Sequence, residues 1–378
     1  MKVRTVTAFV YISKEDSLDV IREILETASA NNVHAKSVFE KEGYEVQTLR
    51  ITTNSFEDYC ENDREAILNK MEELAKIVND IEVSYFSLGN AKTILGMSVI
   101  PDILKMCSKF SLCATIDEDF CNIEDSFSIC GHNVIRLSKE TEQGLGNFNY
   151  TVCCCCKSFI PFFPASFSSP MQGFGGKTMY FGIGTENGDE VVQCFQKCHS
   201  FCEGKYKLLM KLNEEYKSIE TIASSLSSST YIYKGIDTSF NPGLSNERSI
   251  VEGIEQLCIS SYTLPSSFSF GDVGSLSICR LLTSICDDIH VKKTGYCGLM
   301  LPVLEDSKLA QRYGIDTLPL PIDTSLFSII MTYKDVYALS KKWNKQLSCR
   351  LFLCPDIHDG EISKFENPNL TNCIVHAI

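Results

Sequence analysis

The sequence predicts an α/β protein built as one closed, or nearly closed, barrel of about ten strands interleaved with helices. Segments with strand periodicity and segments with helix periodicity alternate along the chain, and no Pro- or Gly-rich linker interrupts them. The composition of the 378 residues, 44% hydrophobic and 22% charged, is typical of a globular protein. We therefore expect one barrel domain over residues 1–378, with an open doubly wound sheet as the alternative.

The N-terminal third shows the alternation most clearly. Residues 1–12 alternate and are rich in Val, Thr, Phe and Tyr, which indicates a strand, and residues 18–31 repeat apolar side chains at helical spacing. The pattern then recurs twice, with strand-like segments at 44–52 and 81–88 and helix-like segments at 63–78 and 99–109. This alternation of strand and helix is typical of an α/β fold.

The rest of the chain continues the pattern with shorter signals. Further strands are expected around Ala114 and at 134–137, 150–156, 231–237, 298–304, 317–322 and 349–354, and one long helix at 189–225. The Ser-rich stretch 223–230 is the one candidate boundary, but a strand resumes directly after it.

Charge and cysteine content exclude several classes of protein. The net charge of −13 comes without a Lys/Arg cluster, which argues against nucleic-acid and anionic membrane partners. The N-terminus lacks the apolar core of a signal peptide, and no window reaches the roughly 20 apolar residues of a membrane helix. We expect a cytoplasmic protein, whose 19 cysteines are reduced, buried thiols rather than a disulfide framework.

Acidic side chains after predicted strands are the first candidates for chemistry, since ligands of α/β folds bind at loops beyond strand ends. Asp237 and Ser239 follow one strand, Glu305 and Asp306 follow another, and Asp316 and Asp323 with Thr324 flank a third. The pattern suits general acid/base work, with Asp237, Glu305, Asp306 and Asp323 as the predicted catalytic residues. Asp237, Glu305 and Asp306 are also candidate ligands for Mg²⁺ or Ca²⁺. The alternative is that these acids cap turns and helices.

Glycines and arginines supply a second set of candidates. Gly271 and Gly274 precede a predicted helix, where free backbone amides can face an anion; close helix packing is the alternative. Glu186 follows Gly182 and Gly184 ahead of the long helix, and Arg4 and Arg50 are candidate partners for a carboxylate or another anion.

Histidines and cysteines give weaker signals. The six histidines make no zinc-type spacing. The run Cys153–Cys156 lies on a predicted strand, so its thiols should alternate between the barrel interior and the helices. A nucleophilic thiol needs a base or positive neighbour, and Lys157 is the one adjacent in sequence. We therefore favour packing, both for this run and for Cys194, Cys198 and Cys202, which share one helix face.

Several blocks resemble the family called domain of unknown function 711. These blocks are VRTVT (3–7), GYEVQTLRITT (43–53), GLGNFNY (144–150), PFFPASF (161–167), GIDTSFNPG (235–243), GYCGLMLPVLED (295–306) and DTLPLPIDTS (316–325). The resemblance implies a ten-stranded barrel like that of pyruvate formate-lyase and other glycyl-radical enzymes, but it implies no reaction. Asn147, in the third block, is a further candidate for substrate binding.

The chain departs from the family pattern in three places. Phe167, Ser168 and Ser169 stand where family members typically carry a histidine, a helical segment is missing between Arg312 and Tyr313, and the four cysteines replace small apolar residues. The C-terminal sequence contains no loop of the glycyl-radical type. We therefore expect no histidine-dependent and no radical chemistry.

Together these features predict an enzyme or enzyme-like binder of a small polar metabolite. A hydrolase of the glycosidase type is one version, because two carboxylates about 5 to 9.5 Å apart suffice for it. The alternative is a non-catalytic binding or scaffold protein that has lost the family site. A homodimer is a further expectation, since a barrel with an exposed apolar face can associate.

Overall fold

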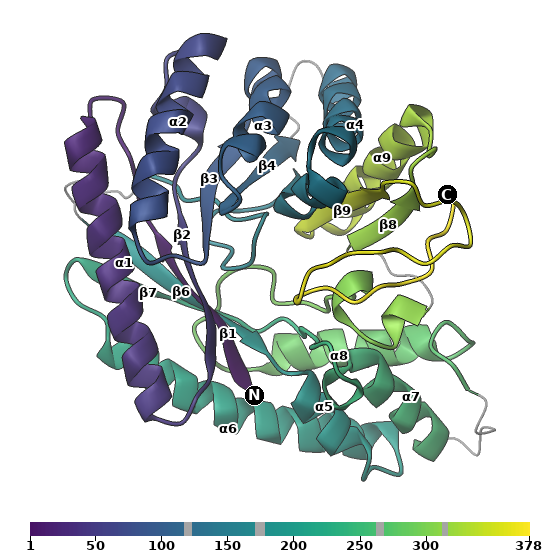
Figure 1. Ribbon diagram of the computed structural model, residues 1–378. Coiled ribbons are helices and arrows are strands. Elements are labelled where there is room, and N and C mark those ends of the chain that lie inside the picture. The colour runs from purple at the N-terminus through teal and green to yellow at the C-terminus, as the bar shows by residue number, and fades with distance from the viewer. Residues whose placement is uncertain (117–122, 171–177, 262–267, 312–316) are drawn as a thin grey trace.

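The strands of the chain form one nine-stranded sheet in the order β7-β6-β1-β2-β3-β4-β5-β9-β8 (Figure 1). This computed structural model describes residues 1–116, 123–170, 178–261, 268–311 and 317–378. The five central strands are parallel. They are β1 (Lys2–Phe9), β2 (Val46–Thr52), β3 (Tyr85–Ala91), β4 (Phe110–Ile116) and β5 (Tyr150–Cys154). The predicted α/β class and the alternation of the N-terminal third are therefore confirmed.

Helices follow the first four strands and lie outside the sheet (Figure 1). They are α1 (Leu18–Lys41), α2 (Arg64–Asp80), α3 (Ile94–Met106) and α4 (Ile123–Glu140). Three of them begin at a side chain that accepts a hydrogen bond from the first turn, namely Ser17, Asp63 and Thr93. Such caps satisfy backbone amides that have no partner inside the helix.

A pair of strands flanks the parallel centre on each side, and both pairs run antiparallel to it. On one side β6 (Met179–Glu186) runs antiparallel to β1, and β7 (Tyr231–Asp237) runs parallel to β6. On the other side β9 (Leu347–Cys354) runs antiparallel to β5, and β8 (Thr317–Pro321) runs parallel to β9. The remaining helices are α5 (Gly188–Phe195), α6 (Phe201–Ser225), α7 (Ile250–Ser261), α8 (Ser275–Asp288) and α9 (Leu326–Trp343).

The prediction of a closed ten-stranded barrel is wrong, because the described sheet has nine strands and two open edges. One predicted strand that does not form is the segment 298–304. Isolated parallel bridges join Ile236 to Lys293 and Phe240 to Leu299, but no strand forms between them. Cys297, with φ 50°, and Gly295, with φ 81°, interrupt the extended backbone there. The segment then continues into a 3-10 helix, η4 (Val303–Glu305).

Other local predictions also differ from the structure. Residues 134–137 belong to α4, because Phe127, Cys130, Val134 and Leu137 form one buried helical face that a four-residue window does not reveal. The long helix predicted at 189–225 is two helices, since the side chain of Ser200 caps a new one. Strand β6 was not among the predicted strands.

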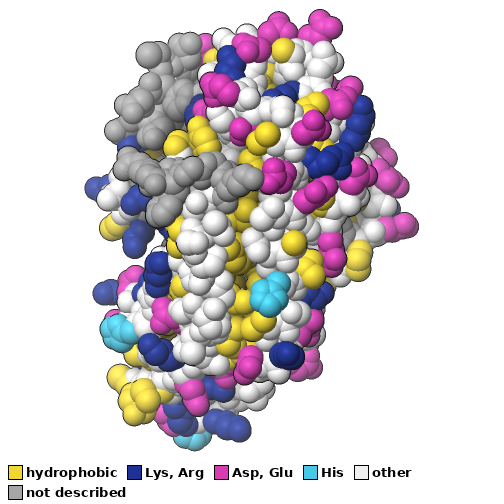
Figure 2. Space-filling view, turned by 90° about the vertical axis from the view of Figure 1, so that its left-hand side faces the viewer, with side chains coloured by type: hydrophobic (Ala, Val, Ile, Leu, Met, Phe, Trp, Pro, Cys, Tyr) yellow, Lys and Arg dark blue, Asp and Glu magenta, His cyan; other side chains and the backbone are white. Residues whose placement is uncertain are grey.

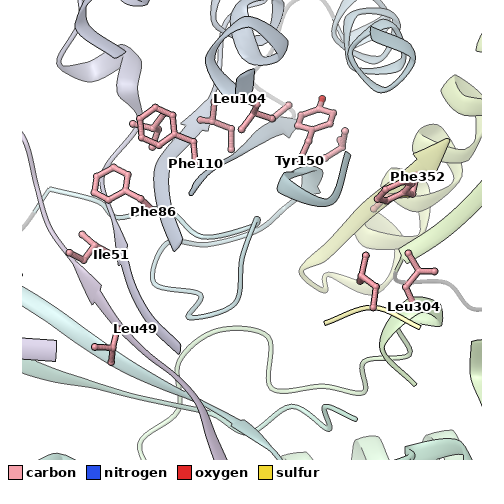
Figure 3. Close-up of a cluster of buried hydrophobic side chains, with 14 of the residues drawn as sticks. Leu49, Ile51, Phe86, Leu104, Phe110, Tyr150, Leu304 and Phe352 are labelled. Carbon is pink, nitrogen blue, oxygen red and sulfur yellow. The ribbon is translucent and has the colours of Figure 1, made fainter. Parts of the chain in front are cut away.

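A large apolar core lies between the strands and the surrounding helices. Figure 3 shows Leu49 and Ile51 of β2, Phe86 of β3, Phe110 of β4 and Tyr150 of β5, all of which are buried. Acidic and basic side chains are interspersed on the face shown in Figure 2. In the described part of the chain, no helix has both the length and the apolar character needed to cross a bilayer.

Residues 161–166, which we call the interior segment, pass through the interior of the curved sheet, toward the carboxyl ends of β1 and β2 and beside the middle of β3. The hydroxyl of Thr7 donates to the carbonyl of Pro161 at 2.9 Å. The hydroxyls of Thr52 and Ser87 donate to the carbonyl of Ser166 at 3.2 and 2.7 Å. These buried bonds hold the segment in place, so it fills the end of the sheet at which α/β folds usually bind ligands.

Candidate functional site

A cavity of about 570 Å³ lies on the interior face of the sheet, near the amino ends of the parallel strands. Its wall includes Lys2 and Arg4 of β1, Thr48 and Arg50 of β2, Tyr85 of β3, Ser111 of β4, Thr151 of β5, Glu186 of β6, and Ser348 and Arg350 of β9. A volume of this size fits a small metabolite. The site therefore lies at the end of the sheet opposite to the one that the interior segment fills.

The cavity is positively charged although the protein is acidic. Among the described residues, its lining contains five basic and three acidic side chains, an excess of two positive charges, whereas the whole chain carries −13. A cavity walled by low-dielectric protein concentrates the field of such charges. The electrostatics favour an anionic ligand at this position.

Five of these charges form a chain of alternating ion pairs across the cavity. Arg248 donates to Glu186 Oε1 at 2.6 Å, and Arg4 donates to Glu186 Oε2 at 3.2 Å. Arg4 also donates to Glu305 Oε2 at 3.1 Å, and Arg350 donates to Glu305 Oε1 at 3.0 Å. The chain thus connects the β7 side of the open sheet, through β1, to β9 on the other side.

Arg4 reaches the cavity because it is the extra residue of a β-bulge. Val3 pairs with Thr185 and Thr5 pairs with Gly184, so three residues of β1 oppose two of β6. A bulge of this kind re-aims a side chain that strict alternation would send to the other face. The bulge therefore explains how Arg4 and the buried Thr5 can both belong to the interior.

Arg50 is the second arginine of the parallel strands, and its environment differs from that of Arg4. It is 7% exposed, and its Nε donates to Thr48 Oγ1 at 3.1 Å. The guanidinium lies over the rings of Tyr85 and Phe163, 5.5 and 5.2 Å from their centroids. Burial, and next the charge of Arg4, lower the pKa of Arg50 to about 10, so it stays charged at neutral pH.

Among the described residues, no carboxylate lies within ion-pair distance of the Arg50 guanidinium. A buried cation without an anion is costly, and a bound anion relieves that cost. Arg50 is therefore the strongest anchor for a negatively charged ligand in the cavity.

Hydroxyl groups line the wall on the β9 side. Thr151 is 2% exposed, and its Oγ1 has no hydrogen-bond partner among the described residues. Ser348 accepts a hydrogen bond from the hydroxyl of Tyr296 at 2.7 Å. Ser111 makes a long contact, 3.5 Å, to the carbonyl of Phe86. These side chains can donate to a ligand's acceptor atoms.

Asp237, a predicted catalytic residue, is fully buried outside the cavity lining. It accepts hydrogen bonds from the amides of Ser239, Tyr296 and Cys297 at 2.8 to 3.0 Å, and from the hydroxyl of Ser239 at 2.6 Å. Burial raises its pKa, and the donors partly offset that effect. Asp237 ties the end of β7 to the loop at 295–298, and Ser239, predicted to bind substrate, belongs to this network.

Asp306 is also fully buried and serves as a helix cap. Its Oδ2 accepts from the amides of Ile250 and Val251 at the start of α7, at 2.9 and 3.4 Å. Its Oδ1 accepts from the hydroxyl of Ser249 at 2.6 Å and from the amides of Lys308 and Leu309 at 3.1 Å each. The capping interpretation describes this contact pattern, and both oxygens face protein donors rather than the cavity.

The other predicted acids are dispersed. Asp323 is exposed on the surface, 3.7 Å from His358, and Thr324 closes its own turn by donating to the carbonyl of Pro321. Asp316 lies outside the described residues. Of the predicted acids, Glu186 and Glu305 line the cavity, so the structure does not gather the strand-end carboxylates at one site.

The remaining predicted ligand-binding residues lie away from the cavity. Asn147 is buried and donates to the carbonyl of Val134 at 3.2 Å. Gly271 and Gly274 have φ values of 104° and 112° in the turn before α8, and nothing lies within 4 Å of where a Cβ would stand at either. Left-handed backbone accounts for glycine at both positions.

The candidate metal ligands are not brought together. The described residues contain no group of three His, Cys, Asp or Glu side chains able to hold a metal. Asp237 and Asp306 direct their oxygens at backbone donors, and Glu305 is paired with two arginines. These residues do not fit a shared Mg²⁺ or Ca²⁺ site in this arrangement.

Only the first two residues of the run Cys153–Cys156 belong to strand β5. β5 ends at Cys154, and Cys155 has φ 53°, so the predicted alternation holds for two thiols rather than four. Cys153 packs in the interior cluster with Cys113 and Phe162, whereas Cys154 packs on the helix side. Burial raises the pKa of Cys153 well above its ordinary value, which supports the packing interpretation.

We expect iodoacetamide to modify Cys202, which is exposed, while Cys153 stays unmodified in the native protein. The physical reason is that a buried, protonated thiol is neither accessible nor nucleophilic. Peptide mass spectrometry of native and urea-unfolded samples measures both sites. Labelling of Cys153 as fast as Cys202 in the native state would instead indicate a reactive thiol.

Sequence reasoning found three members of the ion-pair chain, Arg4, Glu186 and Glu305, and the neighbouring Arg50, but it missed Arg248, Arg350 and Thr151. Arg248 and Arg350 stand in segments with no motif, and Thr151 lies one residue from the cysteine run that drew attention. A scan for isolated arginines within predicted strands would have found Arg350 along with Arg4 and Arg50.

A comparison with protein-family models identifies the family to which the chain belongs. The model described as "Uncharacterised ACR (DUF711)" matches residues 1–313, a range that includes every member of the ion-pair chain except Arg350. No curated protein matches the chain. The resemblance of the fold to the pyruvate formate-lyase barrel stays a prediction. The chain belongs to the uncharacterised DUF711 family, as its sequence blocks predicted.

Proposed function

We propose that this protein binds a small anionic metabolite in the cavity at the amino ends of the parallel strands. The observation that carries the proposal is Arg50, a buried guanidinium stacked on two rings with no carboxylate partner among the described residues. The two excess positive charges of the lining add to it. The cavity is open and polar, which favours a binding protein over a scaffold whose site has collapsed.

The predicted glycosidase-type hydrolysis has weaker support. Glu186 and Glu305 both contact Arg4, and each accepts arginine hydrogen bonds on both of its oxygens. Carboxylates engaged in this way serve as acceptors for guanidinium groups rather than as proton donors to a leaving group. Their structural role, joining the two sides of the sheet, accounts for these contacts. A cytoplasmic location remains part of the proposal.

The test replaces Arg50 and compares the binding of anions with that of neutral ligands. We expect acetate, succinate, sulfate and inorganic phosphate to include binders of the wild type by isothermal titration calorimetry, and glycerol and glucose to bind far more weakly. Arg50→Gln should weaken anion binding at least about tenfold, because a charge-assisted hydrogen bond contributes roughly 1.5–3 kcal/mol. The variant should fold, since it removes a buried charge that has no partner.

Arg22→Gln is the matched control, because Arg22 is an exposed arginine that pairs with Asp80 on the surface. It should bind anions as the wild type does. Equal anion affinity of Arg50→Gln and the wild type, or a preference of the wild type for the neutral ligands, would contradict the proposal.

A further inference from the structure

The cavity wall offers two positions for an acidic group rather than one. The first is Arg50 on β2. The second is a cluster on β4, β5 and β9, which we call the hydroxyl cluster: Ser111, Thr151 and Ser348, with the guanidinium of Arg350. β3 and β4 lie between β2 and β5, so the axes of β2 and β5 are about 14 Å apart along the sheet, at about 4.8 Å per strand.

The strand register makes the hydroxyl cluster compact. Val152 of β5 pairs with Cys349 of β9, and Cys153 pairs with Ser348. The antiparallel register therefore brings Thr151 next to Arg350 on the same face. Cys113 pairs with Thr151 across β4 and β5, which puts Ser111 on the adjoining part of the wall. Three residues with hydroxyl groups and one arginine thus lie on the same face of three neighbouring strands.

The hydroxyl of Thr151 is the observation that indicates a ligand at the hydroxyl cluster. Thr151 is a residue of the cavity wall, and its hydroxyl oxygen is buried without a hydrogen-bond partner among the described residues. Buried polar groups in folded proteins almost always have a partner, so an exception in a cavity wall calls for one. Arg350 lies over the ring of Phe148 and donates to Glu305 at 3.0 Å, which fixes the guanidinium at the edge of the cluster.

The charge of the lining matches two acidic groups. An excess of two positive charges is balanced by a ligand that carries two negative ones. The carboxylate oxygens of Glu186 and Glu305 already accept from arginines, so they offer little to a ligand ammonium group. This arrangement favours an acid without an amine at either end.

We propose that the ligand is an elongated dianion, with one acidic group on Arg50 and the other on the hydroxyl cluster. This inference rests on the proposed function and deepens it by naming the ligand class, a small linear diacid. The interior rings of Phe162 and Phe163, which also line the cavity, can cover the apolar chain between the two groups.

The test is a chain-length series measured by isothermal titration calorimetry at neutral pH. Succinate, glutarate, adipate and suberate are each compared with a monocarboxylate of the same chain length. We expect one diacid to bind at least about tenfold more tightly than its monoacid, because the second group adds charge-assisted hydrogen bonds. Affinity should fall for diacids shorter and longer than this optimum.

Two variants test which acidic group of the ligand binds at each of the two positions. Thr151→Val should lower the affinity of the best diacid about tenfold and leave the affinity of monoacids held at Arg50 unchanged. Arg50→Gln should remove the advantage of diacids over monoacids. Thr238→Val is the matched control, since Thr238 is equally buried but does not line the cavity.

The outcomes separate the two proposals. If monoacids bind, Arg50→Gln abolishes that binding and no diacid binds more tightly, the inference is overturned while the proposed function stands. The same holds if Thr151→Val binds the best diacid as the wild type does. If no acid of the series, no sulfate and no phosphate binds the wild type, both proposals fail.

Discussion

Asp306→Ala is expected to lower the free energy of unfolding by about 3–5 kcal/mol, because the buried carboxylate accepts five hydrogen bonds. Its removal leaves the first amides of α7 and two amides of the following loop without partners in the interior. Urea denaturation followed by far-ultraviolet circular dichroism measures the loss. The free energy of unfolding of Asp306→Asn should lie between those of the wild type and Asp306→Ala, since the amide side chain keeps one acceptor oxygen.

Asp323→Ala is the control for Asp306→Ala, because Asp323 is another aspartate of the predicted acid set but lies on the surface. It should change stability by less than about 0.5 kcal/mol. A small loss in Asp306→Ala, together with loss of ligand binding, would reverse our interpretation and return Asp306 to the site. The comparison therefore separates a capping residue from a catalytic one.

Arg4→Met is the second variant with a large expected effect, a loss of about 2–3 kcal/mol. Arg4 is the central member of the ion-pair chain, and Glu186 beside it is only 2% exposed. Removing one partner of a buried pair leaves its carboxylates uncompensated, which costs more than the pair itself contributes. The loss should be smaller than for a fully buried pair because Arg4 keeps 21% exposure.

Arg22→Met provides the comparison for Arg4→Met, since its ion pair with Asp80 is exposed and should contribute about 0–1 kcal/mol. Urea denaturation at low and high salt measures both variants. The effect of Arg4→Met should persist at high salt, because buried charges are screened less than exposed ones. Equal effects of the two variants would show that the ion-pair chain does not stabilise the open sheet.

The chemistry of the candidate site could be predicted in part. Arg4 and Arg50 are predicted anion partners, Glu186 is a predicted substrate-binding residue and Glu305 a predicted catalytic one, and all four line the cavity. The role of each acid could not be predicted from the sequence, because catalytic carboxylates and capping carboxylates can both follow a strand. Asp237 and Asp306 have the capping type of contact, which depends on the donors that other segments bring to them.

The location of the site could not be predicted from strand ends. The general rule places ligands at the carboxyl ends of parallel strands, but here the interior segment accepts hydrogen bonds from Thr7, Thr52 and Ser87 at that end. A segment of loop composition gives no sign that it will run through a sheet rather than over its surface. The cavity is therefore left at the amino ends.

The sequence by itself determined the α/β class, the alternation of strands and helices in the first third of the chain and the family, because these depend on local periodicity and on blocks of contiguous residues. Only the tertiary structure decided that the sheet stays open, that a bulge turns Arg4 inward, and that Arg248 and Arg350, 102 positions apart by their numbers, share one ion-pair chain. The physical reason is that such features arise from contacts between distant segments. Periodicity reports which face of an element is buried, but not which charged side chain of another element will meet it.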